Sequence, residues 1–217
     1  PGTYSYSGDR AMRNVLRSTR SHNTLQVGDY EINPFDPAVL FRMEDYARPI
    51  VTKWKTDDAY DLFIGCHRGF SQRKIKAKHE RTFLFNKKHD YLLIRDQLKV
   101  KGSQPITDPV YIRFHLSQES SIDEGQSVVG LPDKVREDME RIGLRGYMNP
   151  IIDLAVHVRY PDGQHLYIVP FFGKHLIAVK SIESTFVSPS YGVKLPSKKV
   201  VYAVTMGETK INYQTCI

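Results

Sequence analysis

The sequence predicts an all-β fold, an antiparallel β-sandwich of multi-stranded sheet layers with one or two short helices. Apolar and polar residues alternate with a period of two over many runs, turn-forming residues separate these runs at intervals of roughly 10–15 residues, and only two segments are helical in period. The 217 residues, 41% hydrophobic and 25% charged, fit one large β-domain or two small ones. Because no linker-like segment interrupts the chain, we expect one domain over residues 1–217.

The first helix is predicted over residues 8–20. Asp9 can cap it, and Met12, Val15 and Leu16 fall on one face. Four arginines at spacings of three or four residues would form a positive stripe, which is either a binding surface or a solvated face: Arg10, Arg13, Arg17 and Arg20. The second helix is predicted over residues 132–143, with a proline near its first turn.

Strands are predicted from residue 24 onward, where the period changes. The strand-like runs are 24–28, 50–54, 60–66, 74–85, 91–98, 110–116, 153–160, 165–171, 176–179, 184–187 and 199–206. Residues 86–90 join two of these runs as a hairpin, and the turn Pro161-Asp162-Gly163-Gln164 predicts another. Antiparallel pairing through such hairpins is what a sandwich requires.

The chain carries a net charge of +7, from 31 Lys and Arg against 24 Asp and Glu. A basic surface attracts polyanions, so nucleic acid, acidic lipid and acidic polysaccharide are all candidate partners on charge alone. We expect no nucleic-acid partner, because no helix-turn-helix, zinc finger or RNA-binding aromatic motif is present. We also expect no membrane span, since no apolar run approaches the roughly 18–20 residues that one needs.

Several short motifs occur along the chain in a fixed order. Near the N-terminal end, Pro1-Gly2-Thr3-Tyr4 precedes Arg17-Ser18-Thr19-Arg20-Ser21-His22-Asn23-Thr24. Then come Gly28-Asp29-Tyr30-Glu31, His67-Arg68-Gly69-Phe70, His79-Glu80-Arg81, a strand that ends in Asp96, Phe114-His115-Leu116 and Ser188-Pro189-Ser190-Tyr191-Gly192. In this order the motifs resemble those of the heparinase II/III family of polysaccharide lyases. The resemblance covers essentially the whole chain.

The resemblance implies that residues 1–217 are the C-terminal β-sandwich part of a lyase. Its partner would be its own N-terminal α/α toroid, absent from this chain, and we expect an Asp directly before Pro1 and a His-x-His stretch further upstream. Such lyases cleave acidic, uronic-acid-containing polysaccharides by β-elimination. In them the toroid supplies the residue that neutralises the uronate carboxylate and the principal Tyr, so we expect the sandwich alone to be inactive. The alternative is a non-catalytic module that binds or scaffolds an acidic glycan. The family also suggests a periplasmic or extracellular bacterial location.

The resemblance also implies which residues form the site. Tyr4 and Tyr6 are the candidate catalytic residues, although each could equally be a tyrosine at a strand edge. The candidate substrate-binding residues are Arg17, Arg20 and Asn23. His22 is the candidate metal ligand; without the motif, a lone histidine is more often a structural hydrogen-bonding group. Zinc is the expected cofactor of the intact parent, and we expect the fragment alone to bind none.

The sequence also suggests where four further residues lie or what role they have. His79 and Arg81 lie on the same side of one predicted strand, and we expect them to be structural. His115 stands between Phe114 and Leu116 and is expected to point into the protein. Trp54 is expected in the core rather than as a platform on which a sugar stacks.

Overall fold

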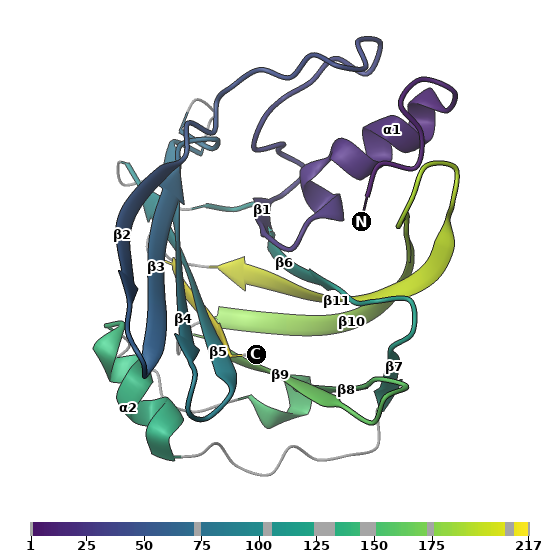
Figure 1. Ribbon diagram of the computed structural model, residues 1–217. Helices are drawn as coiled ribbons and strands as arrows, with labels where there is room; N and C mark the ends of the chain where they lie inside the picture. The colour runs from purple at the N-terminus through teal and green to yellow at the C-terminus, as the bar shows by residue number, and fades with distance from the viewer. Residues whose placement is uncertain are drawn as a thin grey trace.

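Two antiparallel sheets form the protein in the computed structural model, which describes residues 2–71, 75–101, 106–123, 133–143, 151–172, 176–206 and 211–216. A four-stranded sheet has the order β1-β6-β11-β10, and an eight-stranded sheet has the order β2-β3-β4-β5-β12-β9-β8-β7. The small sheet lies across the concave face of the large sheet (Figure 1). The predicted all-β sandwich is confirmed.

The described elements, in chain order, are α1 (Arg10–Arg17), η1 (Thr19–Ser21), β1 (Leu25–Val27), β2 (Ile50–Thr56), β3 (Tyr60–His67), β4 (Ala77–Asn86), β5 (Tyr91–Val100), β6 (Val110–His115), β7 (Ser121–Asp123), α2 (Asp133–Arg141), η2 (Ile152–Leu154), β8 (Val156–Arg159), β9 (His165–Phe172), β10 (Leu176–Val187), β11 (Leu195–Met206) and β12 (Ile211–Cys216). The runs predicted at 176–179 and 184–187 are one strand, β10. Strands β7 and β12 were not predicted. Three predicted features begin outside the described residues: the N-terminal motif at Pro1, the strand-like run at Lys74 and the second helix at Pro132. None of the described helices is long and apolar enough to cross a membrane.

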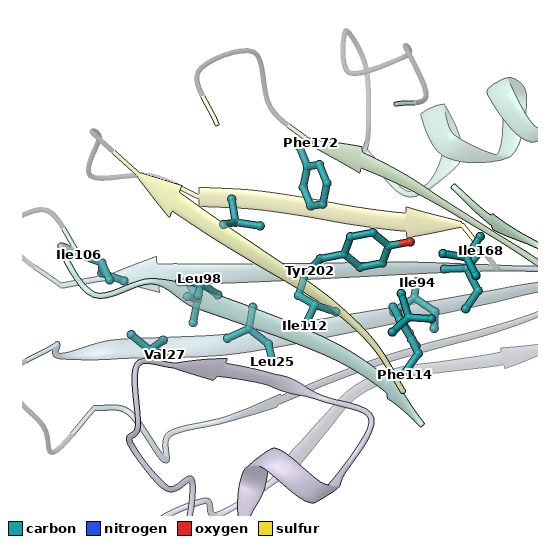
Figure 2. Close-up of a cluster of buried hydrophobic side chains, with 14 of the residues drawn as sticks. Leu25, Val27, Ile94, Leu98, Ile106, Ile112, Phe114, Ile168, Phe172 and Tyr202 are labelled. Carbon is teal, nitrogen blue, oxygen red and sulfur yellow. The ribbon is translucent and has the colours of Figure 1, made fainter. Parts of the chain in front are cut away.

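The main core fills the space between the two sheets. Alternate residues of β6, namely Val110, Ile112 and Phe114, point inward and are buried, which leaves their neighbours on the outer face. Figure 2 shows side chains of both sheets converging here, including Ile94 and Tyr202. The period-two pattern therefore fixes which residues of the small sheet face the core and which face outward.

The outer face of the large sheet is covered by α2. Val135 and Met139 of this helix pack against Leu84, Leu93 and Phe171 of three strands, and the helix runs beside β2 and β3 in Figure 1. This second core explains the helical period at residues 132–143, since one face of α2 must bury apolar side chains.

A fully buried carboxylate joins α2 to the sheet. Asp138 accepts hydrogen bonds from Nδ2 of Asn86 at 2.7 Å and from the hydroxyl of Tyr91 at 2.6 Å. Both donors stand at the β4–β5 hairpin. Both bonds go to Oδ2, whereas Oδ1 accepts no hydrogen bond among the described residues and lies 3.6 Å from Nη1 of Arg141. The two bonds and this nearby cation offset part of the cost of burying the carboxylate.

A second buried network lies inside the large sheet, and its hydrogen bonds have only one consistent direction. The backbone N–H of Gly69 donates to Nδ1 of His67 at 3.2 Å, so Nε2 of His67 carries the ring proton. That nitrogen lies 2.8 Å from Nδ1 of His79, which must therefore accept. Nε2 of His79 then donates to Asp96 at 2.7 Å. Each imidazole is held as one neutral tautomer.

Arg81 completes this network on the far side of the carboxylate. Its Nε and Nη2 donate to the two oxygens of Asp96 at 2.6 and 2.8 Å, and its Nη1 donates to the carbonyl of Asn23 at 2.5 Å. Burial alone would raise the pKa of Asp96, but the charge of Arg81 and the bond from His79 hold it well below its usual range. We call His67, His79, Arg81 and Asp96 the polar network. The predicted structural role of His79 and Arg81 agrees with these contacts.

We predict that Tyr91→Phe lowers the free energy of unfolding by about 1.5–3 kcal/mol, because Asp138 loses a charge-assisted bond in a buried site. Urea unfolding followed by circular dichroism measures this. Tyr167→Phe is the control, since Tyr167 is an exposed ring on β9. Equal stability of Tyr91→Phe and the wild type would contradict the role of Asp138.

We predict that acid destabilises the protein partly through His67. Burial, and then the neighbouring His79 ring and the charge of Arg81, lower the pKa of His67 from 6.5 to about 3. Between these values the unfolded chain binds a proton that the native protein does not, so the free energy of unfolding falls as the pH falls. In His67→Phe this dependence should weaken by about 1.4 kcal/mol per pH unit near pH 5.

Urea titrations at several pH values between about 4 and 6.5 test this, with the exposed neighbour variant Arg68→Gln as the control. The control should keep the wild-type dependence. An unchanged dependence in His67→Phe would show that the proton balance of folding lies elsewhere.

Candidate functional site

The N-terminal segment folds onto one end of the small sheet. The Asp9 carboxylate accepts the Met12 N–H at 2.9 Å and caps α1. Gly2 pairs with Ser188 just beyond β10, with φ of 87°. A Cβ at Gly2 would lie 1.9 Å from the Ser188 carbonyl oxygen, so only glycine fits there. Figure 1 shows α1 beside the tip of the β10–β11 hairpin.

Tyr4 and Tyr6 lie against this hairpin. The Gly192 N–H donates to the Tyr4 carbonyl at 2.7 Å, and the ring of Tyr6 stacks on Tyr191 with centroids 5.7 Å apart. Tyr6 is 56% exposed. Both tyrosines are therefore positioned by the hairpin, and their predicted catalytic roles stay predictions.

Arg17 is engaged inside the protein. Its guanidinium lies 4.0 Å from the ring centre of Phe35 and donates to the carbonyls of Asp36, Leu40 and Arg42 at 2.9–3.3 Å. The side chain is buried. These contacts hold the loop after β1 against α1, and a contact between Arg17 and a sugar would require them to break. Arg20, by contrast, is exposed.

His22 follows η1 and is exposed. Partial removal from water lowers the pKa of its ring, while a hydrogen bond to the Leu16 carbonyl and the charge of Glu31 oppose the shift. The next residue, Asn23, contacts His115 directly, and His22 contributes to the lowered pKa of His115. The structure thus brings a predicted site residue next to a histidine that we expected elsewhere.

Asn23 fixes the orientation of His115. The backbone N–H of His115 donates to Oδ1 of Asn23 at 2.8 Å, which identifies that atom as oxygen. Nδ1 of His115 lies 3.1 Å from the same oxygen and must donate to it. The lone pair of neutral His115 is therefore on Nε2, which has no hydrogen-bond partner among the described residues.

The prediction that His115 points into the protein is wrong. Strand β6 buries Phe114, so the alternation of the strand places His115 on the outer face, where it is half-buried. Desolvation and the charges of Lys199, His22 and Arg113 lower its pKa to about 4. The ring is thus neutral at neutral pH and can accept a proton.

Two cations flank His115 on the same outer face. Lys199 of β11 pairs with His115 in the sheet register, and its Nζ lies 2.9 Å from Glu183. Arg113 donates to Gln26 at 2.8 Å. Burial lowers the pKa of Arg113, but a guanidinium stays charged at neutral pH. We call His22, Asn23, Arg113, His115 and Lys199 the cationic face.

The cationic face combines a neutral imidazole with fixed positive charges. Such charges can bind a carboxylate or sulfate, and a neutral imidazole can take up a proton from a bound molecule. Sequence reasoning found His22 and Asn23 but missed Arg113, His115 and Lys199. Following the alternation of residues 110–116 outward from the buried positions would have found Arg113 and His115.

The donor set does not fit a zinc ion. Among the described residues, no three His, Cys, Asp or Glu side chains gather to hold a metal. His22 could supply one ligand, whereas zinc sites use three or four. A zinc site would therefore need ligands from outside the described residues, and the predicted metal-binding role of His22 stays a prediction.

Comparison with solved structures supports the fold. Over 99% of its length, the chain is similar to the heparan sulfate lyase HepC from Pedobacter heparinus, with 19% identity and a TM-score of 0.64. It is also similar to the heparinase III BT4657 gene product, with 17% identity, 99% coverage and a TM-score of 0.62. The chain spans only 27% of the length of each of these two proteins.

No curated protein sequence matches the chain. The family model described as "Heparinase II/III-like, C-terminal" matches residues 1–214, nearly the whole chain. The ordered motifs and the sandwich agree with this match. The chain therefore belongs to the heparinase II/III-like C-terminal family.

Proposed function

We propose that this chain is the β-sandwich part of a lyase that cleaves a uronic-acid-containing acidic polysaccharide by β-elimination. The observation that carries the proposal is the cationic face, where Asn23 holds a neutral His115 between Arg113 and Lys199. The membership of the family supports the lyase class, and the similar heparan sulfate lyase suggests an acidic glycan.

The chemistry of β-elimination needs what this face offers. The C5 proton of a uronate is weakly acidic, so positive charge near the carboxylate must stabilise the developing enolate. A group with a free lone pair must then accept the proton. In this proposal Arg113 and Lys199 bind the carboxylate, and Nε2 of His115 accepts the C5 proton while the C4–O4 bond breaks and the electron pair leaves with O4.

A helical toroid would supply the opposite wall of such a site. By family resemblance the toroid carries further residues that bind the substrate, and this chain alone would then bind glycan without turning it over. Tyr4 and Tyr6 lie at the β10–β11 hairpin. They would approach the substrate from the end of the small sheet where the cationic face lies.

We predict that His115→Gln, in the product of the complete gene, lowers kcat about 10²–10⁴-fold with little change in KM, because it removes the proton acceptor and keeps a polar group of similar size. The assay follows the ultraviolet absorbance of unsaturated uronate. His165→Gln, an exposed histidine of β9, is the control. Wild-type turnover by His115→Gln would exclude His115 as the base.

We predict that Arg113→Gln weakens binding of a uronate oligosaccharide by the isolated chain roughly tenfold at low salt. The loss should shrink as salt screens the exposed charges. Calorimetric titration measures the affinity, and Lys134→Gln on α2 removes the same charge elsewhere. An equal loss in both variants would mean that net charge alone drives binding.

A glycan-binding module without catalysis would give a different pattern. Arg113→Gln would still weaken binding, but the product of the complete gene would release no unsaturated uronate from any of several acidic polysaccharides. Duplex DNA serves as the competitor, and stronger binding of DNA than of glycan would contradict the proposed ligand class.

A further inference from the structure

A row of aromatic side chains crosses three neighbouring strands at one edge of the large sheet. Trp54 of β2 pairs with Phe63 of β3, which pairs with Phe83 of β4. Their ring centres lie 5.8 and 6.0 Å apart. Phe83 also packs against the main core, so the row lies on the concave face of the sheet and runs from the core to the open edge.

The expectation that Trp54 belongs to the core is wrong. Trp54 is 67% exposed, and all seven residues of β2 are exposed. Strand β2 is the edge strand of the sheet among the described residues. An exposed indole next to two more rings is the kind of surface that binds a flat apolar face.

Two hollows adjoin this row and share Phe63 and Phe83. One, of about 400 Å³, is lined by Trp54, Asp61, Phe63, Phe83, Phe85 and Leu92. The other, of about 320 Å³, continues past Ile50 and Arg81 to Thr24. We call Trp54, Phe63, Phe83, Phe85 and Leu92 the aromatic trough.

Polar groups stand at both ends of the trough. At one end, Lys87 donates to the Asp61 carboxylate at 2.8 Å and to the Thr56 hydroxyl at 3.2 Å. At the other end are Arg81 and Thr24, the residue after Asn23 of the cationic face. The trough and the adjoining hollow together lead from the open sheet edge to Thr24, next to the candidate site.

The edge itself is poorly suited to pairing with another strand. A register shift interrupts β2 between Val51 and Lys53, and the exposed lysines Lys53 and Lys55 follow on the same strand. Irregularity and lysines are the features by which edge strands avoid pairing with another chain. The exposed rings therefore favour a ligand that stacks rather than an added strand.

We infer that the aromatic trough is a second binding subsite for the same acidic polysaccharide, several sugar units away from the cationic face. Sugar rings would stack on Trp54 and Phe63, and hydroxyl groups would bond to Asp61 and Lys87. Lys87 at one end and Arg81 at the other supply positive charge for uronates on the side of the sheet that carries the rings. This inference rests on the proposed function and extends it from one binding point to an extended one.

The chain contains one tryptophan, so Trp54 fluorescence reports directly on the trough. Titration with a series of uronate oligosaccharides of increasing length should give a saturable change in its emission with the longer members. In calorimetry, Trp54→Ala should weaken binding of a long oligosaccharide roughly three- to tenfold, and Trp54→Phe should retain most of the affinity. Circular dichroism confirms that each variant is folded.

Two variants separate this subsite from the proposed function. Tyr167→Ala removes an exposed ring elsewhere on the large sheet and should bind normally. Arg113→Gln should weaken binding while the Trp54 signal of bound glycan persists. Normal binding by Trp54→Ala with unchanged Trp54 emission would overturn the subsite and leave the cationic face intact. Absence of any glycan binding would also overturn the subsite, and so would a dimer of the wild-type chain that Trp54→Ala dissociates. Release of unsaturated uronate by the product of the complete gene would still decide the proposed function.

Discussion

The hydrogen bonds of Asn23 join the two sheets at the point where the candidate site forms. Its carbonyl accepts Arg81 from β4 of the large sheet, and its side chain accepts the backbone and the ring of His115 from β6 of the small sheet. Because Arg81 is also paired with the buried Asp96, Asn23 is anchored to a rigid interior. A catalytic group gains from such support, since its orientation is set before the substrate arrives.

This arrangement gives a physical reason for the order of the sequence motifs. The turn at His67 to Phe70 supplies the first donor of the polar network, the His79 to Arg81 strand supplies its middle, and Asp96 supplies its charge. The motifs are far apart in sequence, but antiparallel pairing of β3, β4 and β5 brings them together. Changing one member would leave a buried polar group without a partner, which is costly.

The sequence predicted most of the fold because the sandwich depends on patterns that are local. Alternation located most strands, and Asp9 marked the start of α1. The errors have physical causes as well. Strand β7 has only three residues, too few for a pattern. The apolar neighbours of His115 suggest a buried ring, whereas the alternation of β6 places it on the outer face. The sequence suggests a core position for Trp54 because it does not reveal that β2 is an edge strand. Arg17 lies in a basic motif, yet long-range contacts with residues 35–42 determine its place.

The most direct test of this account is the protonation of His115, read by nitrogen NMR of the labelled chain. The account predicts a neutral ring with the proton on Nδ1 at neutral pH, which becomes charged only near pH 4. In Asn23→Ala, where the acceptor is gone, the ring should populate both tautomers. A proton on Nε2 in the wild type, or the same single tautomer in both proteins, would contradict the claim that Asn23 prepares His115 for chemistry.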